Sequence, residues 1–170
     1  MIHRRLFFAF WPDEALRHGL SAARRSLFPM SGRPVELAGV HVTAAFLGAV
    51  SESRLDVLTA LCGPVQPLTI TFDRLEHWPK PRVLVAATTH VPDDLRGLVD
   101  GLWQQLDRLG FSREARSFRP HVTLARDVRS VRPGLKWEPF RWPANRLELI
   151  EAVSTPDGVV YRPVPKTLPR

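Results

Sequence analysis

A short pattern occurs twice in this chain, as His-Val-Thr-Ala-Ala at residues 41–45 and as His-Val-Thr-Leu-Ala at residues 121–125. Valine favours an extended backbone, and alternate residues of a strand share a face. Each copy therefore predicts a strand whose histidine and threonine point to the same side. If the fold brings the copies together, two groups that can carry protons near neutral pH face each other, with two hydroxyls able to hold an anion.

The repetition matters because a single His-x-Thr motif carries little information. A lone histidine beside a valine is more often a packed or surface residue than a catalyst. Here each copy is predicted to be a strand that follows a helix by a comparable interval. The chain therefore looks like two related halves.

The remaining pattern predicts strands and helices around the two copies. Residues 4–10 form a continuous apolar run, which predicts a strand in the middle of a sheet with both faces covered. Alternating apolar residues predict further strands, and leucines at helical spacing between capping residues predict helices. The other predicted strands are 40–46, closed by Gly48, 68–72, 82–88, 147–153 and 159–164, and the predicted helices are 12–27, 51–62 and 92–109.

A long exposed loop is predicted from residue 127 to residue 143, where four residues are proline or glycine. This stretch also contains three aromatic residues, Trp137, Phe140 and Trp142. Aromatic rings among arginines can stack on nucleic-acid bases, or they can pin the loop to the body of the protein. The sequence leaves both interpretations open.

The composition sets the broad class of protein. A chain of 170 residues with 44% hydrophobic and 24% charged residues fits one globular domain spanning residues 1–170. Cys62 has no cysteine to pair with, which indicates a reduced compartment. The apolar run before Pro12 is too short for a secretion signal, and no stretch has the length of a membrane span. We therefore expect a cytoplasmic protein that makes no membrane contact. We also expect a monomer.

The net charge of +7 is unevenly distributed. Between residues 113 and 146 there are nine basic and three acidic residues, a local surplus of six that surrounds the second copy of the motif. Such a block attracts a polyanion such as RNA by electrostatic steering and counterion release. The alternative is a solvated basic surface that serves solubility.

Three stretches carry a resemblance to a known family: Arg-Leu-Phe-Phe-Ala at 5–9, the first motif followed by Phe-Leu-Gly at 46–48, and Arg-Pro-His-Val-Thr-Leu-Ala-Arg at 119–126. With its two His-x-Thr motifs the chain resembles the 2H phosphoesterase superfamily, and within it the RNA 2′,3′-cyclic phosphodiesterases, formerly 2′-5′ RNA ligases. The resemblance implies an α+β fold. It also implies a bilobed molecule, with two pseudo-symmetric antiparallel sheets backed by helices around a central cleft.

The resemblance further implies hydrolysis of RNA 2′,3′-cyclic phosphate ends to a 2′-phosphate, without a metal or another cofactor. By position, His41 corresponds to the proton donor and His121 to the proton acceptor. Thr43, Thr123 and Arg126 correspond to phosphate-binding residues.

The same chemistry can be argued from the residues. Opening a cyclic phosphodiester needs an activated water and a protonated leaving oxygen, and two imidazoles can supply both if one is neutral and the other is charged. Hydroxyls and an arginine can meet the charge on the phosphoryl oxygens. Neither motif has a nearby set of carboxylates or cysteines, so no metal site is expected.

Two positions depart from the simplest interpretation. Ala44 stands where the family usually has leucine, and strict alternation places it with Val42 and Phe46 on the face away from His41. The change is then expected to affect packing rather than chemistry. Alternation would also turn Arg126 toward the core, so its role at a phosphate requires the strand to end or bulge there.

By the same alternation, Ala45 and Ala125 would continue the faces of the histidines and leave room for a substrate. Four other residues are weaker candidates for nucleotide contacts: Phe8, His77, Trp78 and Tyr161. A packed indole explains Trp78 equally well. His3, His18 and His90 have no repeated partner and are expected to be structural or exposed.

Two other functions stay open at this point. One is hydrolysis of another phosphodiester, such as a 2′-5′ linkage or another cyclic nucleotide, by the same pair of histidines. The other is a non-catalytic RNA-binding protein, which the basic block and its aromatic residues would support.

Overall fold

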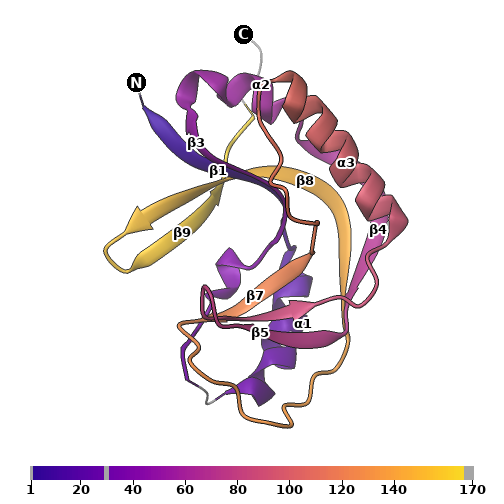
Figure 1. The fold of residues 1–170 in the computed structure, drawn as a ribbon, viewed down its shortest axis with the longest axis vertical. Helices are drawn as coiled ribbons and strands as arrows, with labels where there is room; N and C mark the ends of the chain where they lie inside the picture. Colours follow the sequence, from indigo (N-terminus) through magenta and orange to yellow (C-terminus); the bar gives the residue numbers. More distant parts are fainter. Residues whose placement is uncertain (1, 29–30, 167–170) are drawn as a thin grey trace.

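The computed structural model describes residues 2–28 and 31–166 (Figure 1). In these residues most of the regular structure is strand, with an α-helix after β1, β3 and β6. The strands are β1 (His3–Phe10), β2 (Arg33–Pro34), β3 (Val42–Ser51), β4 (Gly63–Phe72), β5 (Arg74–Trp78), β6 (Val83–Ala87), β7 (His121–Arg126), β8 (Phe140–Thr155) and β9 (Gly158–Pro163). The α-helices are α1 (Glu14–Arg24), α2 (Leu55–Thr59) and α3 (Asp93–Arg108), and the 3₁₀ turns are η1 (Arg25–Leu27), η2 (Leu37–Gly39) and η3 (Glu52–Arg54).

The strands form one antiparallel path in the order β4-β8-β1-β3-β7-β6-β5, with β2 paired to β7 and β9 paired to β8. The two halves of this path meet where β3 pairs with β7, through the partners Val42 and Val122. These are the central valines of the two motifs. The predicted α+β class is confirmed, and the hydrogen bonding of the two halves is continuous through this one pair.

Helix α1 forms where the sequence provides a cap and an apolar side. Asp13 accepts a hydrogen bond from the backbone N–H of Leu16 at 2.7 Å, which caps α1. Leu16 and Leu20 of α1 are buried in the main core. In Figure 1, α3 lies on the opposite side of the molecule from the projecting β8–β9 hairpin. No helix of the described residues has both the length and the apolar character that crossing a membrane would need.

Strand β1 lies in the middle of the sheet, between β8 and β3, and both of its faces are covered, as predicted. Leu6, Phe8 and Phe10 belong to the main core together with residues of all three α-helices. Phe7 and Ala9 point to the other face, where a small cluster with Ile150 covers them. Thus β1 separates the large core from the face that carries the motifs.

Each motif strand contains a bulge directly after its threonine. In β3, Thr43 pairs with Ala9 and Ala45 pairs with Phe8, so Ala44 has no partner in β1. A bulge of this kind reverses the alternation beyond it. Ala45 therefore joins the core, where it is 2% exposed, and the expectation that it continues the face of His41 was wrong.

Strand β7 repeats this irregularity. Thr123 pairs with Val85 and Ala125 pairs with Leu84, which leaves Leu124 without a partner in β6. Ala125 is fully buried in the main core rather than beside the substrate face. The bulge that a phosphate role for Arg126 requires is present.

Other boundaries differ from the sequence expectations. Strand β3 does not close at Gly48 but continues to Ser51, and Gly48, with a φ of 75°, lies next to a second bulge at Leu47. Phe46 pairs with Phe7, so it lies on the face of the motifs and not on the core face. The predicted helix 51–62 consists of the shorter η3 and α2.

The predicted loop 127–143 contains the beginning of β8, which starts at Phe140. Trp142 is fully buried, and the Trp137 indole N–H donates to the carbonyl of Phe72 at 2.9 Å. These two rings therefore pin the segment to the body of the protein.

Candidate active site

The two motifs lie side by side on one face of the sheet. Because β3 and β7 are antiparallel and Val42 pairs with Val122, the residue before one valine stands across from the residue after the other. His41 therefore stands across from Thr123, and Thr43 across from His121. All four side chains are half-buried, whereas both valines are fully buried in the core. The arrangement gives two imidazoles and two hydroxyls on one face.

Both histidines are held in the same way. His41 Nδ1 lies 2.7 Å from the carbonyl oxygen of Gly39, and His121 Nδ1 lies 2.8 Å from that of Arg119. In each case the acceptor is the residue two positions earlier. A carbonyl only accepts, so Nδ1 donates in both rings and Nε2 is the nitrogen that can exchange a proton.

His41 is enclosed by aromatic rings. Phe7 and Tyr161 lie 4.8 Å from it between ring centroids, and Trp11 stacks on it at 6.0 Å. This burial lowers the pKa of His41 to about 4, and the charges of His121 and Arg126 act in the same direction, against the hydrogen bond to Gly39. In the free protein His41 is therefore neutral at pH 7.

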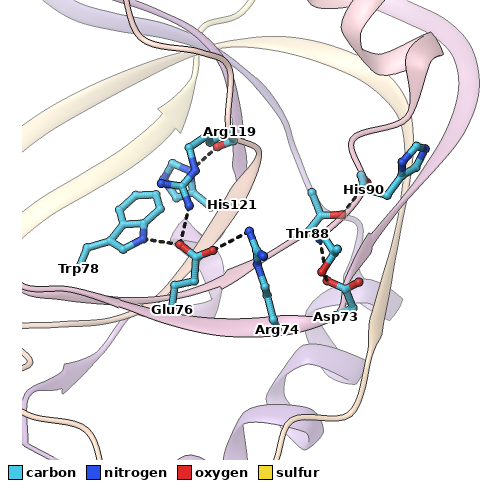
Figure 2. Close-up of polar contacts among 9 residues, drawn as sticks. Asp73, Arg74, Glu76, Trp78, Thr88, His90, Arg119 and His121 are labelled. Atoms are coloured by element: carbon cyan, nitrogen blue, oxygen red, sulfur yellow. Dashed lines mark hydrogen bonds and ion pairs between the residues drawn. The ribbon is translucent and has the colours of Figure 1, made fainter.

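His121 packs against Trp78, with 4.6 Å between ring centroids (Figure 2). The Glu76 carboxylate accepts from the Trp78 indole at 2.8 Å and from Arg119 at 2.7 Å, and it also pairs with Arg74 at 2.9 Å. The same Arg119 supplies the carbonyl that holds His121. Glu76 thus fixes two of the groups around His121.

The pKa of His121 is also lowered, first by burial. The hydrogen bond to the Arg119 carbonyl and the charge of Glu76 oppose this shift, while the charges of Arg119 and Arg126 add to it. Both histidines therefore lose their proton more readily than a histidine in water.

Arg126 reaches the motif face after the bulge in β7. Its Nη2 donates to the Tyr161 hydroxyl at 3.1 Å, and its charge acts on both histidines. A cation placed here can bind an anion held between the imidazoles. Arg126 and Tyr161, both candidates from the sequence, are therefore brought to the histidines.

Two other candidates from the sequence, Phe8 and His77, do not lie beside the histidines. Phe8 is fully buried in the main core on the opposite face of β1, and the place beside His41 belongs to Phe7. His77 pairs with Leu84 of the main core, and its Nε2 lies 3.0 Å from the carbonyl oxygen of Val128. His77 thus braces the start of a loop, while its neighbour Trp78 contacts His121.

Sequence reasoning missed the residues that surround the histidines without belonging to a motif: Phe7, Trp11, Glu76 and Arg119. Of these four residues, only Phe7 could have been identified from the pattern of the sequence. The bulkier set Leu6, Phe8 and Phe10 in β1 is the better core face, which leaves Phe7 for the other face. Among residues 2–28 and 31–166, no group of three or more histidine, cysteine or acidic side chains could hold a metal ion.

Paired His-x-Thr strands of this kind define a phosphoesterase-like site, and comparison with known proteins gives the family. The family model described as the 2′-5′ RNA ligase superfamily matches residues 11–155. The chain belongs to this superfamily.

Individual relatives are more specific. The chain is 36% identical to the RNA 2′,3′-cyclic phosphodiesterase of Escherichia coli (strain K12) over 141 residues, which are 79% of this chain and 80% of the relative. It is 27% identical to the protein of the same name from Archaeoglobus fulgidus over 93% of this chain and 96% of the relative. The crystal structure of E. coli LigT complexed with 3′-AMP matches with a TM-score of 0.80 and 29% identity, over 96% of this chain and 97% of that chain.

Proposed function

We propose that this protein hydrolyses RNA 2′,3′-cyclic phosphodiester ends to a 2′-phosphomonoester by metal-independent acid/base catalysis. The observation that carries this proposal is the pairing of Val42 with Val122, which sets two identically held histidines on one face with Thr43 and Thr123. The relatives named RNA 2′,3′-cyclic phosphodiesterase support hydrolysis of a cyclic phosphodiester.

In the proposed reaction a water oxygen attacks the phosphorus, and His121 Nε2 accepts the proton of that water. The bond between phosphorus and the 3′-oxygen breaks, and His41 Nε2 donates a proton to this leaving oxygen. The products are a 2′-phosphomonoester and a free 3′-hydroxyl. His41 leaves the step neutral and His121 leaves it charged, and exchange with solvent restores both.

The non-bridging phosphoryl oxygens lie between Thr43, Thr123 and Arg126. Donors fixed in this way stabilise the charge that develops in the transition state. The bound phosphate also has a second effect. An anion beside His41 favours the charged imidazole, so it raises the pKa of His41 from about 4 and lets the ring carry the proton that it must donate.

Two half-buried aromatic side chains at the histidines, Trp78 and Tyr161, offer surfaces for the nucleoside. Trp78 lies beside His121, and Phe7 and Tyr161 lie beside His41. Each base has a flat π-face that such rings can contact without sequence preference. We assign Trp78 and Tyr161 to this role, whereas Phe7 is 3% exposed and packs against His41 instead.

The pH dependence follows from the two lowered pKa values. Catalysis needs one histidine neutral and one charged, so kcat/KM is expected to rise through the lower pKa, about 4, and to fall through the upper one, which lies below 6.5. The kcat profile should lie at higher pH, because the bound phosphate raises both pKa values. Steady-state rates from pH 3.5 to 9 test this. A kcat/KM that still rises above pH 8 would contradict the assignment.

A turnover assay separates this enzyme from its alternatives. The protein, treated with EDTA, is incubated with a nucleoside 2′,3′-cyclic phosphate and, separately, with a 2′-5′-linked dinucleotide. We expect the cyclic phosphate to be consumed at the rate of untreated protein. Consumption of the 2′-5′ dinucleotide alone favours the other phosphodiesterase. RNA binding that weakens with salt, with no substrate consumed at high protein concentration, favours a binding protein.

A further inference from the structure

A surface cavity of about 460 Å³ lies at the end of β7, beyond the two motifs. It is lined by Ser31, Gly32, Arg33, Arg82, Asp127 and Arg129. Three arginines and one carboxylate give the lining a charge of about +2. Such a cavity attracts an anion.

The cavity adjoins the proposed phosphate-binding arginine. Arg126 is the last residue of β7, and its strand partners are Arg33 of β2 and Val83 of β6. Residues directly opposite in a sheet share a face, with about 4.5–5.5 Å between their Cβ atoms. Arg33, which lines the cavity, therefore stands beside Arg126 on the face of the two histidines.

The walls of the cavity are fixed to each other. Ser31 Oγ accepts hydrogen bonds from the backbone N–H groups of Arg129 and Ser130, each at 3.3 Å, and donates to the Ser130 carbonyl at 2.9 Å. Gly32 has a φ of 102°, and a Cβ at this position would lie 2.6 Å from the carbonyl oxygen of Arg126. Only glycine allows this close approach. The arginines thus project from a frame that is built before any ligand binds.

Asp127 already shows how the cavity holds an anionic oxygen. Its Oδ2 accepts from Arg33 Nε at 3.1 Å and from Nη2 at 2.7 Å, while Arg82 lies 3.9 Å from its Oδ1. These contacts, the hydrogen bond from Arg33 first, lower the pKa of the Asp127 carboxyl. The carboxylate holds Arg33 in place and offsets part of the positive charge, so it limits the affinity of the cavity for a second anion.

We propose that this cavity binds a phosphodiester of the RNA strand on the 5′ side of the terminal nucleotide. The inference rests on the proposed function, because a cyclic phosphate at a 3′ end leaves all other phosphates of the strand on the 5′ side. The cavity would then favour an RNA end over a free cyclic nucleotide.

Two substrates test the proposal, a nucleoside 2′,3′-cyclic phosphate and a trinucleotide that ends in one. We expect the wild-type protein to show the higher kcat/KM on the trinucleotide, with a rate that falls with salt. In the Arg33→Gln/Arg129→Gln variant the loss should be confined to the trinucleotide. The slope of log kcat/KM against log salt should become shallower by about 0.7 for each arginine removed.

Asp127→Asn is expected to change kcat/KM on the trinucleotide in the opposite direction. Asparagine tolerates the φ of 58° at this position, and loss of the carboxylate leaves more positive charge for the RNA. Its kcat/KM should rise on the trinucleotide. Arg96→Gln on the exposed side of α3 is the matched control and should change neither substrate. Arg129→Gln alone keeps the Ser31 contacts, which use only the backbone of Arg129, and serves if the double variant does not fold.

The outcomes separate the two proposals. If the wild-type protein consumes neither substrate, the proposed function fails, and binding of a labelled trinucleotide 3′-phosphate to the same variants still tests the cavity. If the preference, the salt slope and this binding are unchanged in Arg33→Gln/Arg129→Gln and in Arg129→Gln, the cavity is a solvated surface and the inference is overturned.

Discussion

His41→Ala and His121→Ala are each expected to lower the turnover of a nucleoside 2′,3′-cyclic phosphate by about 10²–10⁴-fold, the usual contribution of one positioned proton transfer. The double variant should cost little more than the worse single variant, because residues that act as a unit are not additive. Both variants should remain folded, since the histidines are half-buried and the core valines beside them are unchanged. The measurements are the turnover rate of each variant on the cyclic phosphate and its thermal unfolding, which checks that the variant is folded.

A histidine outside the site provides the control for this prediction. His18 is exposed on α1, and His18→Ala should keep full activity. A substrate with a good leaving group, such as an aryl phosphodiester, separates the two roles. Because such a group needs no proton, it should restore activity to His41→Ala more than to His121→Ala. Full activity of either single variant on the cyclic phosphate contradicts the acid/base assignment.

Thr43→Val and Thr123→Val are each expected to lower kcat by about 10²–10³-fold, the usual cost of removing one fixed donor to a developing charge. Valine keeps the shape of threonine and suits a strand, so the loss reports the hydroxyl rather than the fold. The loss should appear mainly in kcat, because the donor acts most strongly on the transition state. Steady-state kinetics on the cyclic phosphate provide the measurement.

Thr71 is a matched control for these variants. It lies exposed in β4, outside the motif strands, and Thr71→Val should keep both kcat and KM. A rise in KM alone in Thr43→Val or Thr123→Val would mean that the hydroxyl binds the ground state and transition state equally. Unchanged kinetics in both variants would remove the threonines from the site.

The motifs themselves could be predicted because their information is local. An alternation of two residues determines that His41 shares a face with Thr43, and His121 with Thr123, whatever the rest of the chain does. The burial of Ala44 on the core side followed from the same rule. The pairing of the two copies needed the repeat as well, since a single strand does not identify its neighbour.

The positions after each threonine could not be predicted because they depend on register. The bulges at Ala44 and Leu124 reverse the faces beyond them, and only the partner strands reveal this. Phe46 and Arg126 thereby reach the motif face. The sequence showed that Arg126 could reach the phosphate only if the strand ended or bulged before it. It could not show whether such a bulge is present.

The surroundings of the histidines could not be predicted because they come from distant segments. Glu76 and Trp78 of β5 meet Arg119 before β7, and no spacing in the sequence connects them. The basic block predicted from 113 to 146 likewise does not include all of the positively charged residues near the site. Arg33 and Arg82 line the cavity at the end of β7 from outside that block.

The most direct test of the His41 and His121 mechanism is the identity of its product. A nucleoside 2′,3′-cyclic phosphate is incubated with EDTA-treated protein and followed by ³¹P NMR, with His121→Ala as the blank. Proton donation to the 3′-oxygen predicts a nucleoside 2′-phosphate as the single product. A 3′-phosphate, an equal mixture of the two isomers, or a cyclic phosphate that remains intact would contradict the mechanism.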